Sequence, residues 1–124
     1  MSDQANHSHR VLVVEDEFLL ASLLEELLPE LGCVVQCTAA SVDDALDALS
    51  TQPIDIAFLD INLGGKPSFP VADALASRGI PFAFATGYGV MGLPEQYAGH
   101  IVLQKPYSLR DIEQALAKMT SQAD

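Results

Sequence analysis

The stretch IDIAFLD, residues 54–60, predicts a buried β-strand that ends in an aspartate. Four more short apolar runs flank it in the chain: VLVV (11–14), CVVQC (33–37), PFAFAT (81–86) and HIVLQ (100–104). The run at 11–14 contains no polar residue, as expected of a strand that is covered on both faces. We therefore expect one sheet of five strands.

Helical patterns fill the intervals between these strands. Leucines recur at helical spacing from 20 to 31, and Pro29 and Gly32 mark the end of that helix. Ser41 begins a second helix, and Asp44 completes its capping box.

Two further helices follow the third and the fifth strand. One spans 70–78 and opens with a proline, a favourable residue for a first turn, and the other runs from about Ser108 to about Met119. The interval 87–99 carries four glycines and a proline, so only a short turn is expected there, around 93–97.

This alternation of strand and helix predicts an α/β fold, a doubly wound parallel sheet with helices on both faces. Ligands of such sheets bind beyond the carboxyl ends of the strands. The residues that end each strand are therefore the candidates for a functional site.

Polar side chains stand at these strand ends. Glu15 and Asp16 follow the first strand, Asp60 ends the third, Thr86 ends the fourth and Lys105 follows the fifth. Carboxylates that are brought together raise each other's proton affinity unless a cation joins them. A hard cation such as Mg²⁺ is held by a few carboxylates together with backbone oxygen and water. We therefore predict a Mg²⁺ site at this edge.

The same side chains suit phosphoryl transfer. A carboxylate such as that of Asp60 is a competent nucleophile toward phosphorus, which gives an aspartyl phosphate. Lys105 and Mg²⁺ would neutralise the charge of the transferring group, and Thr86 would donate a hydrogen bond to a phosphate oxygen. Glu17 is interpreted only as a charge that the helix dipole favours in a first turn.

The length of 124 residues suits one domain, and 49% apolar residues are enough for a sizeable core. We expect the domain to span 10–120, with a flexible N-terminal tail over 1–9 and a C-terminal tail over 121–124. The start of the chain is polar and does not resemble a secretory signal.

Six basic residues against 17 acidic ones give a formal charge of −11, which argues against nucleic acid and anionic membranes as partners. No apolar run is long enough to span a bilayer. Two cysteines, Cys33 and Cys37, are too few for a disulfide scaffold, and their spacing places both on one face of a strand. We expect a cytoplasmic protein.

Four motifs carry a resemblance to a known family: VVED (13–16), FLDINL (58–63), FATGY (84–88) and LQKPYS (103–108). In this order and spacing they resemble the receiver domains of two-component response regulators, and the resemblance covers 11–119. It implies a flavodoxin/CheY-like (βα)5 fold with strand order 2-1-3-4-5 and a short or irregular fourth helix.

The resemblance also implies roles for the residues at the strand ends. Asp60 is implied to be the phosphoacceptor, and Asp16 a direct Mg²⁺ ligand. Glu15 is implied to assist through water, and the backbone carbonyl of Asn62 to be a further ligand. Asp60 itself is implied to contact the metal.

For the remaining site residues, the resemblance implies that Thr86 is the switch hydroxyl and Lys105 the phosphate-binding lysine, followed by a cis bond to Pro106. Receivers usually carry an aromatic switch residue three positions before this lysine, where this chain has Val102. Three explanations stay open: a tyrosine at 88 or 107 substitutes, or phosphorylation orders residues 87–99.

The FATGY pattern resembles the FATGUY receiver subgroup of alphaproteobacteria, whose members are often stand-alone domains. This implies a sensor histidine kinase of the HWE or HisKA-2 type as partner. The downstream partner is unknown, and the output is either protein contact or a phosphate sink. We expect a monomer or weak homodimer that catalyses only its own phosphorylation and dephosphorylation. Tyr97 and Tyr107 are each interpreted as surface residues or as parts of a partner face.

Two other functions share parts of this pattern. A phosphatase of the haloacid-dehalogenase type also uses a strand-end aspartate, a hydroxyl and a lysine, but it needs a second aspartate where this chain has Asn62. A receiver-like module without phosphorylation would lack one of the acids, Asp60 or Lys105, and a flavin-binding domain would need a phosphate-cradling loop after its first strand.

Overall fold

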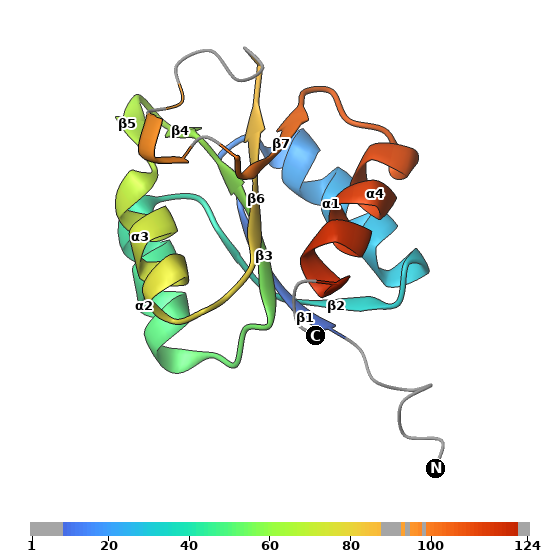
Figure 1. Ribbon diagram of the computed structural model, residues 1–124, viewed down its shortest axis with the longest axis horizontal. Coiled ribbons are helices and arrows are strands. Elements are labelled where there is room, and N and C mark those ends of the chain that lie inside the picture. Colours follow the sequence, from blue (N-terminus) through green and yellow to red (C-terminus); the bar gives the residue numbers. More distant parts are fainter. Residues whose placement is uncertain (1–8, 88–92, 94, 98, 122–124) are drawn as a thin grey trace.

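Apolar segments form the five strands of one parallel sheet (Figure 1). The computed structural model describes residues 9–87, 93, 95–97 and 99–121. The strands are β1 (His9–Val14), β2 (Cys33–Ala39), β3 (Ile56–Asp60), β6 (Phe82–Thr86) and β7 (Ile101–Gln104). Their order, β2-β1-β3-β6-β7, confirms the predicted 2-1-3-4-5, because two short strands of a hairpin take the numbers between β3 and β6.

Among the described residues, four α-helices form two layers around this sheet: α1 (Phe18–Glu30), α2 (Val42–Thr51), α3 (Phe69–Ser77) and α4 (Leu109–Ser121). Figure 1 shows α1 and α4 on one face and α2 and α3 on the other. Along β1, Val11 and Val13 pack in the α1/α4 layer, and Leu12 and Val14 pack in the α2/α3 layer. All four are buried, which explains the run without a polar residue.

The predicted helix starts are largely confirmed. The Ser41 hydroxyl accepts a hydrogen bond of 3.1 Å from the backbone N–H of Asp44. At α4, Ser108 and Asp111 form a reciprocal capping box: the Ser108 hydroxyl accepts from the Asp111 N–H at 3.2 Å, and the Asp111 carboxylate accepts from the Ser108 N–H at 2.9 Å. In α1, Pro29 lies in the last turn and the helix ends one residue later.

Strand β2 corrects the expectation that Cys33 and Cys37 share a face. The register with β1 shifts there, so Val35 pairs with Val11 and Cys37 pairs with Leu12, the next residue of β1. This β-bulge inserts one residue, and an inserted residue reverses the alternation of side chains beyond it. Cys33 therefore belongs to the α1/α4 layer, whereas Cys37 packs against the α2/α3 layer.

The segment after β3 contains an antiparallel hairpin of β4 (Asn62–Leu63) and β5 (Lys66–Pro67). Gly64 and Gly65 make its two-residue turn with φ angles of +59° and +88°. Two successive positive φ angles are the requirement of a type I′ hairpin turn, which glycine meets at little cost.

Between β6 and β7 the described residues include a 3₁₀ helix, Glu95–Tyr97, at the predicted short turn. Its Tyr97 is buried, which corrects the surface interpretation. The ring stacks on Phe69 with 4.9 Å between centroids and meets the edge of Phe84 at 5.6 Å. The hydroxyl donates to Asp73 of α3. Residues 88–92, 94 and 98 lie outside the described residues, and with them most of the segment expected to become ordered.

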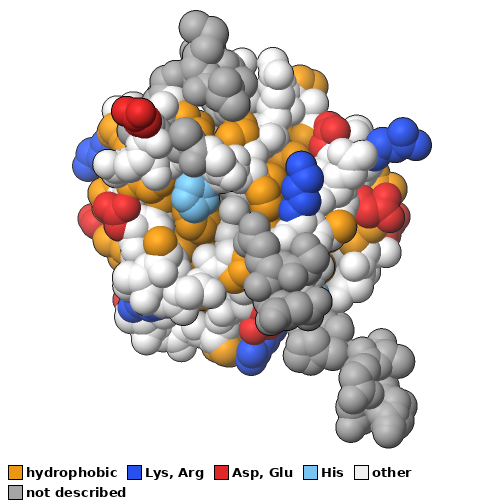
Figure 2. All heavy atoms as spheres, viewed as in Figure 1, with side chains coloured by type: hydrophobic (Ala, Val, Ile, Leu, Met, Phe, Trp, Pro, Cys, Tyr) orange, Lys and Arg blue, Asp and Glu red, His pale blue; other side chains and the backbone are white. Residues whose placement is uncertain are grey.

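Basic side chains appear as separate blue groups on the face seen in Figure 2, and they form no continuous patch among the residues coloured there. In the described ranges, no helix combines the length and apolarity needed to cross a bilayer.

An ion pair between Arg10 and Asp55 connects β1 to the residue before β3. It lies at the end of the sheet opposite the carboxyl ends of the strands, where the candidate site is expected. The Arg10 guanidinium donates to both carboxylate oxygens of Asp55, at 2.9 and 3.1 Å, and the Arg10 backbone N–H donates to the same carboxylate at 2.8 Å. The hydrogen bond from the Arg10 side chain holds the pKa of Asp55 below its ordinary value.

We predict that Asp55→Asn lowers the melting temperature at pH 7 by roughly 2–4 °C. The depressed pKa means that the carboxylate stabilises the fold above its unfolded-state pKa, and this contribution is lost as the pH falls through the folded-state pKa. Thermal unfolding at pH 7 and near pH 3 tests this, with Asp47→Asn, an exposed aspartate of α2, as the control. A difference between Asp55→Asn and wild type that stays constant across these pH values would contradict it.

Candidate functional site

A pocket of about 530 Å³ opens at the carboxyl ends of the strands. Its lining includes Asp16, Asp60, Thr86 and Lys105, which come from the ends of four different strands. Glu15 lies directly beside it, within contact of Lys105. The structure thus brings together the strand-end residues that the sequence singled out.

Three carboxylates converge here. One oxygen each of Glu15, Asp16 and Asp60 lies within 4.8 Å of the others. Glu15 and Asp60 are 3% and 6% exposed, whereas Asp16 is exposed. The donor set is all hard oxygen, the kind that Mg²⁺ prefers, so these three residues fit the predicted metal.

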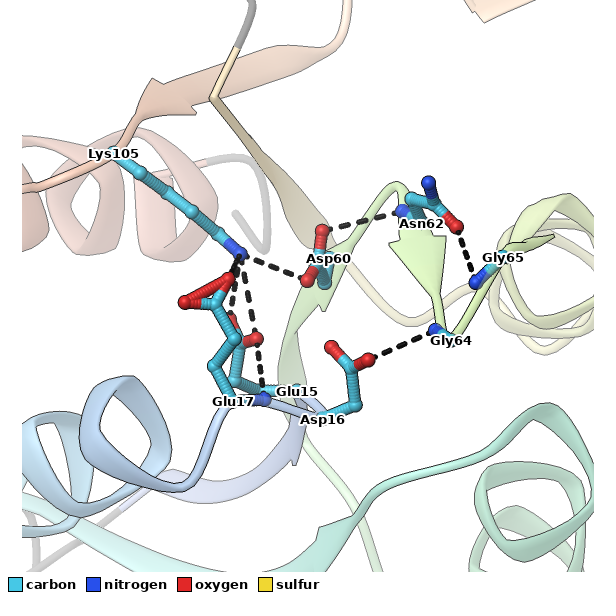
Figure 3. A network of polar contacts seen from close by, with 8 residues as sticks. All are labelled: Glu15, Asp16, Glu17, Asp60, Asn62, Gly64, Gly65 and Lys105. Atoms are coloured by element: carbon cyan, nitrogen blue, oxygen red, sulfur yellow. Dashed lines mark hydrogen bonds and ion pairs between the residues drawn. The ribbon is translucent and has the colours of Figure 1, made fainter.

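Backbone groups hold the acids in place (Figure 3). The Gly64 N–H in the hairpin turn donates to Asp16 at 2.8 Å, and the Asn62 N–H donates to Asp60 at 3.2 Å. The Asn62 side chain accepts from the Gly65 N–H at 3.0 Å and so stabilises the hairpin. This contact uses the Asn62 side chain, whereas the predicted metal ligand is the backbone carbonyl of Asn62.

Lys105 lies at the centre of the charges. Its ammonium is 2.8 Å from an oxygen of Asp60, 3.2 Å from one of Glu15 and 3.4 Å from one of Glu17. The Lys105 side chain is 12% exposed, so solvent screens its pairs with the buried Glu15 and Asp60 only weakly. The bond from Lys105 to Pro106 is cis, as the resemblance implied.

The electrostatics follow from this crowding. Burial raises the pKa of Glu15 to about 7, and the neighbouring Asp60 adds to the rise, while the N–H of Glu17 and the charge of Lys105 act against it. Burial alone would lower the pKa of Lys105, but its hydrogen bond to Asp60 and the charges of Asp60 and Glu15 raise it above the ordinary value. The lysine is therefore protonated. Its single positive charge is outnumbered by the carboxylates around it.

Thr86 ends β6 inside the pocket, where it is 4% exposed. The backbone carbonyl of Thr86 accepts a 2.8 Å hydrogen bond from the backbone N–H of Lys105, and this bond fixes the relative positions of the two residues. Gly87, next along the chain, also lines the pocket and carries no side chain to obstruct it.

Val102 of β7 is half-buried and packs with the α2/α3 layer. Tyr107, one of the predicted substitutes for an aromatic at that position, is buried in the α1/α4 layer instead of lying on the surface. The other predicted substitute, residue 88, lies outside the described residues. Of the two tyrosines among the described residues, Tyr97 is the one that packs in the same layer as Val102.

Glu17 is the site residue that the sequence analysis missed. It is the N-cap of α1, yet its side chain makes no capping hydrogen bond and contacts Lys105 instead. Its position in the run of three acids directly after β1 was the available signal.

Comparisons with known proteins agree with this geometry. The sequence model of the response regulator receiver domain matches residues 11–117. The solution structure of SdrG from Sphingomonas melonis Fr1 is 41% identical and superposes with a TM-score of 0.83, over 91% of this chain and 97% of that one. The receiver domain of the Erythrobacter litoralis response regulator PhyR, at 24% identity and a TM-score of 0.84, covers 94% of this chain and 93% of its own and shares the fold.

Curated relatives match as well. The sensory transduction protein LytT of Bacillus subtilis is 33% identical over 88% of this chain and 47% of its own length. The Bacillus anthracis LytT is 37% identical over 91% of this chain and 48% of its own length. The chain thus spans about half the length of these relatives. The family match and the site geometry agree, and the chain belongs to the response regulator receiver domains.

Proposed function

We propose that this chain accepts a phosphoryl group on Asp60 from a histidine of a sensor kinase. The observation that carries the proposal is the buried Asp60 carboxylate, which lies 2.8 Å from the Lys105 ammonium and borders an open pocket. A nucleophile beside a fixed cation, with room for a phosphoryl group, is what such a transfer needs. The published BeF₃-activated structure of SdrG, 41% identical to this chain, supports the proposal.

The residues divide the work as follows. An Asp60 oxygen attacks phosphorus, the bond from phosphorus to the donor histidine nitrogen breaks, and that nitrogen keeps the electron pair. Lys105 and the Thr86 hydroxyl donate hydrogen bonds to the phosphoryl oxygens. Glu15, Asp16, Asp60 and the backbone carbonyl of Asn62 would hold Mg²⁺, which when bound neutralises charge on the phosphoryl oxygens.

The proposal makes the chain a signalling module that catalyses only its own phosphorylation and dephosphorylation. A phosphatase of the haloacid-dehalogenase type would need an acid at Asn62, whose side chain instead accepts a hydrogen bond within the hairpin. The output is protein contact or a phosphate sink.

We predict that wild-type protein gains one phosphoryl group from a small phosphodonor in the presence of Mg²⁺, and that Asp60→Asn gains none. Lys105→Ala should slow the reaction by about a hundredfold, because a charge-stabilising donor is lost. Intact-mass spectrometry measures both, and Asp47→Asn serves as the control with the same chemical change elsewhere. An adduct that persists in Asp60→Asn would place the acceptor on another residue. No adduct in wild type from small donors and from a panel of kinases would reject the proposal.

We further propose where the kinase docks. Phe18 and Leu19, which follow the acids at the start of α1, are each 80% exposed, far more than other large apolar side chains in the described residues. Exposed apolar side chains beside a reactive site favour a protein partner there. The motif FATGY at 84–88 supports membership of the FATGUY subgroup of receivers. We propose a kinase of the HWE or HisKA-2 type, a cytoplasmic location, and a monomer or weak homodimer.

We predict that Phe18→Ala combined with Leu19→Ala slows phosphoryl transfer from the cognate kinase by roughly tenfold or more, because two exposed anchors each contribute about 1 kcal/mol or more to docking. Phosphorylation by a small donor should stay within about twofold of wild type, which separates docking from chemistry. Val34→Ala is the control, since Val34 is 47% exposed but lies at the opposite end of the sheet from Asp60. Equal slowing with both donors would show that the double variant damages the site itself.

A further inference from the structure

The Lys105 ammonium has no donor left over for a phosphoryl group. An ammonium carries three N–H donors. The three carboxylates in contact with it belong to Glu15, Glu17 and Asp60 (Figure 3). Lys105 can therefore bind a phosphoryl oxygen only if one of these contacts is given up.

Glu17 is the contact that gives way at least cost. Its pair with Lys105 is the longest, at 3.4 Å against 2.8 Å for Asp60, and its side chain is 60% exposed against 7% for Asp60. A released Glu17 carboxylate is solvated by water, whereas a released Asp60 carboxylate would stay buried without its cation.

Glu17 also adds a charge that the site does not balance. A bound Mg²⁺ together with Lys105 would balance the three carboxylates of the metal cluster, Glu15, Asp16 and Asp60. Glu17 lines the same pocket, and Lys105 is the only basic side chain in the described lining. The entrance to the reaction centre therefore carries a surplus negative charge, which opposes the approach of an anion.

We propose that Glu17 is a specificity-determining residue that discriminates against free anionic phosphodonors. It occupies one donor of Lys105 until the reaction, and it repels small anions at the entrance. A kinase overcomes this barrier because protein contacts bring its phosphohistidine into the pocket. The inference rests on the proposed function and refines it.

The test compares Glu17→Gln with wild type, using acetyl phosphate, a small anionic donor, in the presence of Mg²⁺. The phosphorylation rate constant should rise roughly three- to tenfold at low ionic strength and by less at about 1 M salt, where the Debye length is only about 3 Å. Transfer from the kinase should change less than about twofold. Glu17→Asp, which keeps the charge, should stay near wild type, and Glu26→Gln, an exposed glutamate of the same helix, should change nothing.

Binding of inorganic phosphate gives a readout that needs no chemistry at Asp60. In the presence of Mg²⁺, NMR titration at the Thr86 and Gly87 amides should give a phosphate Kd about threefold lower in Glu17→Gln than in wild type or Glu26→Gln. An unchanged Kd, or a rate gain that is independent of salt, overturns the inference. Failure of the proposed function has a different signature, namely no adduct on Asp60 in any variant.

Discussion

The rest of this site depends on the ion pairs of the Lys105 ammonium with the buried carboxylates of Asp60 and Glu15. The ammonium joins the ends of β1 and β3 to the residue that follows β7, and it supplies positive charge where burial has raised the pKa of Glu15 to about 7. A cation is required here because neighbouring buried carboxylates repel each other. The same need for positive charge favours binding of Mg²⁺ by these carboxylates, and a phosphoryl group on Asp60 would be stabilised by the same cations.

The fold supplies the precision that this chemistry needs. Parallel strands end at one edge, so Asp60 and Thr86 reach the same pocket from strands that pair directly. The hairpin after β3 then adds backbone donors, with Gly64 fixing Asp16 and Asn62 fixing Asp60. Acids held by main-chain groups are pre-organised without any contribution from solvent-exposed side chains.

Much of the fold and of the site could be predicted from the sequence, because the features concerned produce patterns among residues that are close together in the chain. The cap residues and the strand-end acids follow from periodicity and motif, and the strand order follows from the resemblance to receiver domains. What the patterns missed depends on tertiary structure. The hairpin rests on Gly64 and Gly65 taking positive φ angles, the burial of Tyr97 rests on Phe69 and Phe84, and the role of Glu17 rests on a lysine 88 residues away.

The bulge in β2 has a consequence for how the domain can be observed. Because it turns Cys33 and Cys37 toward different helical layers, the two thiols report on different halves of the protein. Cys33 is buried and its thiol pKa is raised by burial, so alkylation there requires the α1/α4 layer to open. Cys37 is half-buried and samples the α2/α3 layer. Without any engineered label, the chain thus contains one intrinsic chemical probe for each side of its sheet.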